Sequence, residues 1–170
     1  MKRLLVSMVV FFSVVVLATS AWAIVTVPGG VDVGSEDVLI DSAKLSNSGL
    51  ATEQAWINSI LGAGWTIEDP DIGVTPSSAS ATDATNVYAF ALPTAPMYFY
   101  VKTGKVDSGS DHFLYSNVDS MDWGVVNIGA WGSDANVGKI SHVGVVPEPA
   151  TLLLLGFGLV GLAGIGRKMH

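Results

Sequence analysis

Hydrophobic residues follow three different patterns along this chain. Residues 4–18 are almost wholly apolar, and residues 150–166 carry no charged side chain. Between them, short runs of alternating apolar and polar residues are separated by Gly, Pro, Asp and Ser. Alternating runs bounded by turn residues are typical of antiparallel strands, whereas continuous apolar runs near the ends are typical of export and membrane segments. We therefore expect one β-rich domain between two hydrophobic ends.

The central pattern predicts a mainly β fold, a small antiparallel β-sandwich or barrel-like sheet with one amphipathic helix. In residues 86–92, for example, Tyr88, Phe90 and Leu92 share one face. Residues 24–34 alternate loosely around a Pro-Gly-Gly turn, and residues 69–85 have the composition of a long loop. The expected strands are residues 38–40, 86–92, 97–102, 112–118, 123–131 and 139–146.

Residues 50–61 are the exception to the strand pattern. Their large apolar residues, among them Trp56, Ile57 and Ile60, recur at helical spacing, and Gly62 is well placed to end a helix. We expect one amphipathic helix whose Trp56 packs onto a sheet.

The N-terminus has the three parts of a secretory signal peptide. Met1-Lys2-Arg3 is basic, residues 4–18 are apolar, and Ala21 and Ala23 form an Ala-x-Ala site. The pattern predicts a signal peptide over residues 1–23, which signal peptidase removes after Ala23 during Sec export. An uncleaved N-terminal anchor is the alternative.

The C-terminal segment also divides into parts. Pro147, Glu148 and Pro149 end the folded region because proline lacks a backbone donor and pushes its predecessor to an extended conformation. Residues 150–166 would span about 26 Å as a helix, enough to cross a hydrocarbon core. Arg167 and Lys168 then favour a cytoplasmic end. We expect a transmembrane helix at 150–166 and an exported domain at 24–146.

Together, Pro147-Glu148-Pro149, the Gly-interrupted Leu-rich span and the basic tail resemble the PEP-CTERM sorting signal, over residues 146–168. The family's tails are usually richer in arginine. The resemblance implies a Gram-negative bacterium in which an exosortase-type membrane protease recognises the motif. It also implies an anchor in the inner membrane before sorting, then a place at the cell surface or in an exopolysaccharide matrix. It says nothing of what residues 24–146 do.

Composition narrows the partners of the exported domain. Residues 24–146 contain fourteen acidic residues and four lysines, a net charge of −10, which argues against nucleic acid or anionic lipid as a partner. The chain has no cysteine. Acidic clusters at 68–71 and at Asp107 and Asp111 could bind calcium, but neither has a twelve-residue calcium loop, and solvated turns are the simpler interpretation. Asp119 and Asp122 belong to the same category.

Few residues suggest catalysis. His112 and His142, with Asp111 nearby, could form an incomplete metal site or an acid/base pair, as a surface hydrolase would need. Both lie in expected strands, where structural histidines are common. The chain has no Gly-x-Ser-x-Gly or His-Glu-x-x-His motif. We expect no enzyme, no cofactor and no metal.

Two further patterns have alternative interpretations. Gly156 to Gly161 matches a dinucleotide fingerprint, but the chain ends nine residues later inside an apolar span, so close packing of a membrane helix, or lipid-facing glycine, explains it better. The domain's aromatic residues could stack on sugar rings if exposed, although most should be core; they are Trp65, Tyr98, Tyr100, Trp123 and Trp131. The sequence thus predicts a non-enzymatic structural or adhesive surface protein, with a carbohydrate- or calcium-binding module as the alternative.

Overall fold

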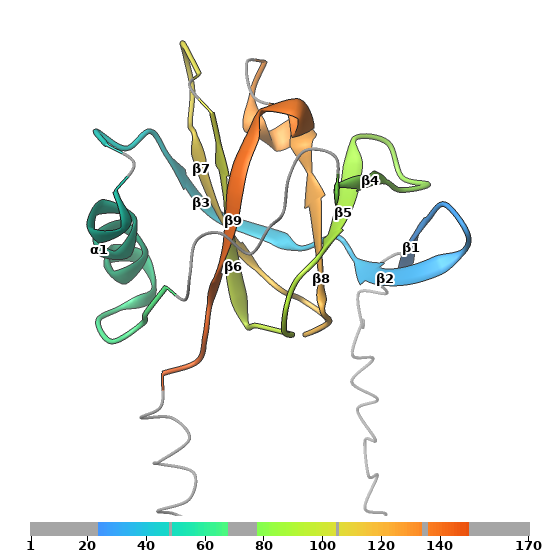
Figure 1. Cartoon of the computed structure of the whole chain (residues 1–170), viewed down its shortest axis with the longest axis horizontal. Helices are drawn as coiled ribbons and strands as arrows, with labels where there is room; N and C mark the ends of the chain where they lie inside the picture. Colours follow the sequence, from blue (N-terminus) through green and yellow to red (C-terminus); the bar gives the residue numbers. More distant parts are fainter. Residues whose placement is uncertain (1–23, 48, 68–77, 105, 134–135, 150–170) are drawn as a thin grey trace, which may run out of the picture.

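The structure is a computed structural model that describes residues 24–47, 49–67, 78–104, 106–133 and 136–149 (Figure 1). These residues form a mainly β domain with one α-helix, which confirms the expected fold class. The expected signal peptide (1–23), transmembrane helix (150–166) and acidic cluster at 68–71 lie outside the described residues. Within the described residues, no helix has the length and apolar character needed to cross a membrane.

The elements follow one another along the chain with short connections. The strands are β1 (Ile24–Val27), β2 (Val31–Ser35), β3 (Val38–Ala43), β4 (Ser80–Ala81), β5 (Val87–Ala91), β6 (Tyr98–Thr103), β7 (His112–Ser116), β8 (Trp123–Asn127) and β9 (Ile140–Val146). The helices are α1 (Leu50–Leu61) and two short 3₁₀ helices, η2 (Ile128–Trp131) and η3 (Val137–Lys139).

Two antiparallel sheets share the largest hydrophobic core. One has the strand order β3-β7-β6-β9 and the other β4-β5-β8. Alternation along the strands sends every second side chain inward. Phe99 and Val101 of β6 therefore meet Phe90 of β5 and Val126 of β8 in one buried cluster. Phe99 stacks on Tyr115 with ring centroids 5.3 Å apart.

The β1–β2 hairpin covers the other face of β5 and β8 (Figure 1). Its turn contains Gly29 and Gly30 at φ values of 101° and 76°, which glycine adopts without steric cost. Val25 and Val33 of the hairpin pack against Val87 and Ala89 of β5. The sequence indicated the turn here but not which sheet the hairpin would cover.

Two expected strands differ in length from those observed. β3 extends to Ala43, beyond the expected end at residue 40. The expected strand at 123–131 ends as β8 at Asn127 and continues as η2. The reason is local: the Asn127 side chain accepts a hydrogen bond from the backbone N–H of Gly129 at 2.9 Å, which favours a helical turn over an extended strand.

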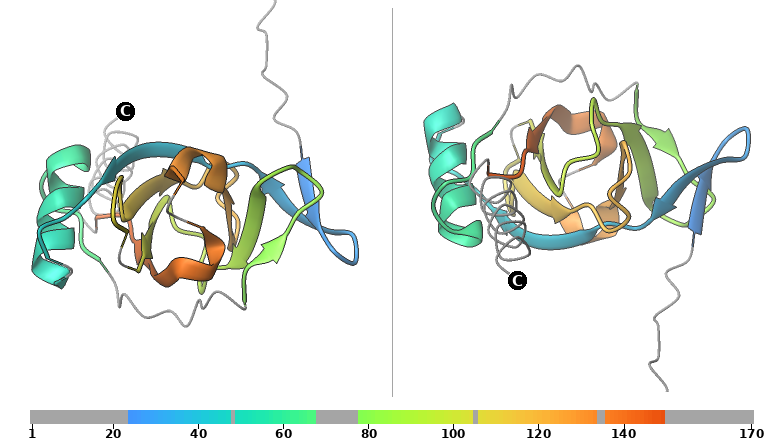
Figure 2. Two further views of the ribbon diagram at one scale, coloured as in Figure 1. Left: turned by 90° about the horizontal axis from the view of Figure 1, so that it is seen from above. Right: turned by 90° about the horizontal axis from the view of Figure 1, so that it is seen from below.

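Helix α1 packs on the outer face of the four-stranded sheet, away from β5 and β8 (Figure 2). Trp56 and Ile57 contact a cluster that includes Tyr100, Leu114 and Val146. The indole N–H of Trp56 donates to Asp41 of β3 at 3.0 Å. The helix ends at Gly62, whose N–H bonds to the carbonyl of Asn58. The expected helix and the packing of Trp56 on a sheet are both confirmed.

Asp37, between β2 and β3, connects the two sheets. Its carboxylate accepts hydrogen bonds from the backbone N–H groups of Val118 at 2.9 Å and Val125 at 2.7 Å. Its own N–H donates to the carbonyl of Val125. Burial raises the pKa of Asp37 to about 7 against the lowering effect of those amides, and the nearby charges of Asp119 and Glu36 add to the rise.

Candidate functional site

Three polar residues form a row across the outer face of the four-stranded sheet, beneath α1. Strand register places Lys102 of β6 directly beside His112 of β7 and His142 of β9. Tyr100 lies two residues before Lys102 and therefore on the same face. On β9, Gly144 pairs with Tyr100, and a Cβ at Gly144 would lie only 2.7 Å from Cζ of that ring. The missing side chain leaves room for the Tyr100 ring.

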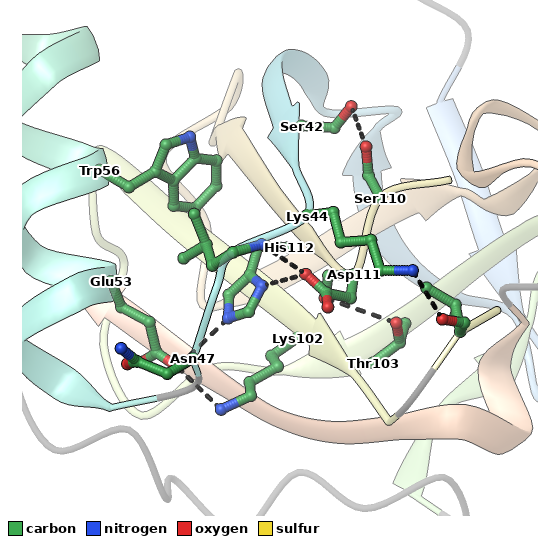
Figure 3. A network of polar contacts seen from close by, with 12 residues as sticks. Ser42, Lys44, Asn47, Glu53, Trp56, Lys102, Thr103, Ser110, Asp111 and His112 are labelled. Atoms are coloured by element: carbon green, nitrogen blue, oxygen red, sulfur yellow. Dashed lines mark hydrogen bonds and ion pairs between the residues drawn. The ribbon is translucent and has the colours of Figure 1, made fainter. Parts of the chain in front are cut away.

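Glu53 of α1 reaches down to this row and is only 1% exposed. Its Oε1 accepts from Lys102 Nζ at 2.8 Å and lies 3.2 Å from His112 Nε2 (Figure 3). Its Oε2 accepts from the Tyr100 hydroxyl at 2.9 Å and lies 3.8 Å from His142 Nε2. One carboxylate thus receives groups from three neighbouring strands and fixes α1 to the sheet.

The partners of Glu53 decide its charge. Burial by itself raises the pKa of Glu53, but the hydrogen bonds from His112, His142, Lys102 and Tyr100 together outweigh burial and hold that pKa far below its usual range. The pKa of Tyr100 moves up, through burial and then through the charge and hydrogen bond of Glu53. Glu53 is therefore an ionised carboxylate and Tyr100 a neutral phenol.

His112 lies between two carboxylates and is 1% exposed. Its Nδ1 is 2.6 Å from Asp111 Oδ1, and its Nε2 faces Glu53. An ionised carboxylate only accepts hydrogen bonds, so with both carboxylates ionised both ring nitrogens donate and the ring is an imidazolium. Trp56 packs edge-on against this ring, with centroids 5.9 Å apart. The ring is thus enclosed by α1, Asp111 and the sheet.

A pocket of about 320 Å³ opens beside this cluster. It lies where the chain leaves β3, where β6 ends, where β7 begins and along the start of β9. Figure 3 shows several of its polar side chains gathered around Asp111 and His112. Its lining residues are Leu45, Asn47, Lys102, Thr103, Gly104, Asp111, His112 and Ser141.

The fold brings together two histidines that the sequence left apart. His112 contacts Asp111, as the hydrolase hypothesis requires, and both His112 and His142 approach Glu53. The sequence analysis did not single out Glu53. Its signal was present, because Glu53 precedes Trp56 by three residues and Ile57 by four, so a charged residue lies on the apolar face of the helix.

Most acidic candidates have other partners. Asp111 Oδ1 accepts from the N–H of Leu45 at 3.2 Å as well as facing His112. Asp119 Oδ2 accepts from the N–H of Ser35 at 2.6 Å. Asp107 and Asp122 are bonded through their backbone carbonyls, to Lys44 and Leu92 respectively. Among the described residues, no three or more His, Asp or Glu side chains gather in a geometry that would hold a metal ion.

The aromatic candidates for sugar stacking are mostly packed inside the fold. Tyr100 and Trp131 are buried, and the Trp131 indole N–H donates to the Tyr115 hydroxyl at 2.5 Å. Trp65 and Tyr98 are half-buried against one another, edge to face, with centroids 5.0 Å apart. Trp123 is half-buried beside the hairpin core. The expectation that most are core holds.

The sorting segment begins inside the folded domain. Val145 and Val146 of β9 are buried and pair with Phe99 and Tyr98 of the central strand β6. Pro147 follows at once, without a linker. Residues 145–168 match the family model of the PEP-CTERM protein-sorting motif. Searches of curated proteins and of solved structures found no match to the chain.

The PEP-CTERM motif is the part of the chain whose function is known by family. It marks an exported protein that an exosortase, a membrane protease, sorts to the cell surface or matrix. The matched span includes Pro147, Glu148 and Pro149, which follow β9, and also Arg167 and Lys168, which lie outside the described residues. Ala21 and Ala23 of the expected cleavage site lie outside them too, and their role stays a prediction.

Proposed function

We propose that this PEP-CTERM protein is a non-enzymatic structural or adhesive component of the cell surface or extracellular matrix of a Gram-negative bacterium. The observation that carries the proposal is the internal pairing of the Glu53 cluster. A catalytic base or acid has to reach a substrate atom. Here both ring nitrogens of His112 face carboxylates, and Glu53 accepts hydrogen bonds from within the fold. Such pairing supports a role in holding α1 on the sheet.

In this proposal the two ends of the chain deliver the domain. The Sec machinery exports it, and signal peptidase removes residues 1–23 at the Ala21-x-Ala23 site. A transmembrane helix at 150–166 holds the domain at the inner membrane until exosortase acts. Since β9 runs directly into Pro147, exosortase meets its motif against a folded domain.

The test is genetic and uses the native host. A strain lacking the chain is complemented with the wild type, with an all-Ala replacement of residues 147–149, or with Pro93→Ala, a control in the exposed turn between β5 and β6. We expect the wild type and the control to restore surface material and cell adhesion, and the all-Ala chain to stay in the membrane fraction. Unaltered adhesion in the deletion strain would refute the structural role.

A second candidate function is a carbohydrate-binding module of the exopolysaccharide matrix. The pocket beside Asp111 and His112 favours it, because its lining mixes carboxylate, amide, hydroxyl and ammonium groups. Titration of the full-length protein with the host's own exopolysaccharide tests this function. An absence of binding would exclude it and leave the structural role intact.

A further inference from the structure

We propose that the pocket beside the Glu53 cluster binds one neutral, polyhydroxylated sugar unit. The inference rests on the carbohydrate-binding alternative above and names its site and ligand class. It starts from the charges around the pocket. Lys102 is 9% exposed and paired with Glu53 at 2.8 Å, and His112 lies between Glu53 and Asp111. Two cations and two carboxylates therefore balance at the pocket floor.

This balance selects against a charged ligand. A carboxylate or ammonium entering the pocket loses hydration, and each charge at the floor already has an opposite charge beside it. The net charge of −7 for the whole chain opposes anions further. A ligand without net charge avoids both costs.

The walls offer hydrogen bonds of both kinds. Within the described residues, Asp111 Oδ1 carries the bonds to His112 and Leu45 while Oδ2 remains an acceptor. Asn47 Oδ1 accepts from Thr52 and from the N–H of Gly49, which leaves its NH₂ group as a donor. The hydroxyl group of a sugar both donates and accepts, so it suits such neighbours.

Two further wall residues complete the match. Ser141 is exposed at the pocket edge and brings a hydroxyl from β9, while Leu45 adds an apolar surface for the C–H face of a ring. A volume of about 320 Å³ is near the small end of ligand pockets. That size fits a single sugar unit or a chain end better than a long stretch of polymer.

The experiment measures binding of small probes to the full-length protein in detergent by saturation-transfer NMR. The neutral probes are the methyl glycosides of glucose, galactose and mannose, together with N-acetylglucosamine; the charged probes are glucuronate and glucosamine. We expect at least one neutral probe to bind about tenfold or more tightly than either charged probe. Tighter binding of a charged probe, or no binding of any neutral probe, would overturn the proposal.

Variants place the binding in this pocket. Ser141→Tyr fills the pocket edge and should abolish binding, whereas Ala55→Tyr adds the same side chain on the exposed face of α1 and should leave binding unchanged. Ser141→Ala, which removes only a hydroxyl and keeps the fold if the larger change does not, should weaken binding about threefold to tenfold. Full affinity in Ser141→Tyr or in Ser141→Ala would contradict the assignment.

The host exopolysaccharide separates this inference from the function on which it rests. If the wild type does not bind the polymer, the carbohydrate-binding function fails, and the pocket proposal fails with it. If the wild type binds the polymer and a correctly folded Ser141→Tyr binds it equally well, carbohydrate binding stands but occurs at another surface.

Discussion

Glu53 and Asp37 are both carboxylates buried to nearly the same degree, yet their protonation differs. Glu53 is 1% exposed and its pKa lies far below the usual range, while Asp37 is 5% exposed and its pKa is raised to about 7. Glu53 faces an ammonium, two imidazoles and a phenol. Asp37 has two backbone amides, and the charges of Asp119 and Glu36 act against its ionisation.

The comparison shows that the kind of partner, more than the depth of burial, decides whether a buried carboxylate is charged. It also separates two mechanical tasks. Glu53 fixes α1 onto the outer face of one sheet through charged partners. Asp37 joins β8 of one sheet to the chain following β7 of the other through neutral amides. The following predictions break or sharpen this contrast, in order of decreasing effect.

Glu53→Gln should have the largest effect on stability. Removing the charge leaves Lys102 and His112 buried without their counter-ion, a loss that typically costs about 3–5 kcal/mol of the free energy of unfolding. Urea unfolding of the full-length protein, followed by tryptophan fluorescence, measures it. Asp83→Asn makes the same change at an exposed carboxylate and should cost far less. Equal losses in the two variants would mean that the cluster is not a special source of stability.

Asp37 predicts a pH dependence of the opposite sign to that of Glu53. Because its folded pKa of about 7 exceeds the ordinary 3.8, its contribution is fully present below about pH 4 and is lost as the pH rises to about 7. The loss is up to about 4 kcal/mol of unfolding free energy. The depressed pKa of Glu53 adds stability above about pH 4.5 that is lost as the pH falls.

The measurement for Asp37 is a difference between two proteins. Unfolding free energies of the wild type and Asp37→Asn are recorded at intervals from pH 4 to pH 8. The wild type should lose stability relative to the variant across this window, because the variant has no proton to release at this position. A constant difference between the two proteins would show that Asp37 does not titrate in that range.

Gly144→Ala tests the space above the Tyr100 ring that bonds to Glu53. The new Cβ would lie 2.7 Å from Cζ and 2.9 Å from the hydroxyl oxygen of Tyr100, so the ring has to shift. Overpacking of this kind costs about 1–3 kcal/mol of unfolding free energy. Gly104→Ala is the matched control, since its Cβ would meet only a backbone carbonyl at 3.6 Å. A thermal-unfolding midpoint of Gly144→Ala equal to that of the control would contradict the close packing.

Much of the fold could be predicted from local patterns. The helix at 50–61 agrees with its observed bounds, and the alternation in 86–92 assigns Phe90 and Leu92 to the shared core. Strand ends were less predictable, because they depend on local bonds such as the turn that Asn127 accepts from Gly129. The signal peptide and the transmembrane helix stay predictions.

The site could be predicted only in part. Periodicity gives the face on which Lys102 lies but not its neighbours, and the row of Lys102, His112 and His142 depends on strand order and register. Those follow from long-range pairing that no local window contains. Glu53 was recognisable as a charged residue on an apolar helix face, but its partners come from strands about fifty or more residues away in sequence.

His142→Gln should have the smallest effect and sharpens the comparison within the cluster. The His142 side chain is 16% exposed and its Nε2 is 3.8 Å from Glu53, whereas that of His112 is 2% exposed and 3.2 Å away. A longer, partly solvated contact is worth less than about 1 kcal/mol. His112→Gln, with two close carboxylates, should cost several times more. Equal losses from the two substitutions in urea unfolding would mean that closeness to Glu53 does not set each histidine's share. A larger loss from His112→Gln would extend the lesson of Glu53 and Asp37 to the cations of one cluster.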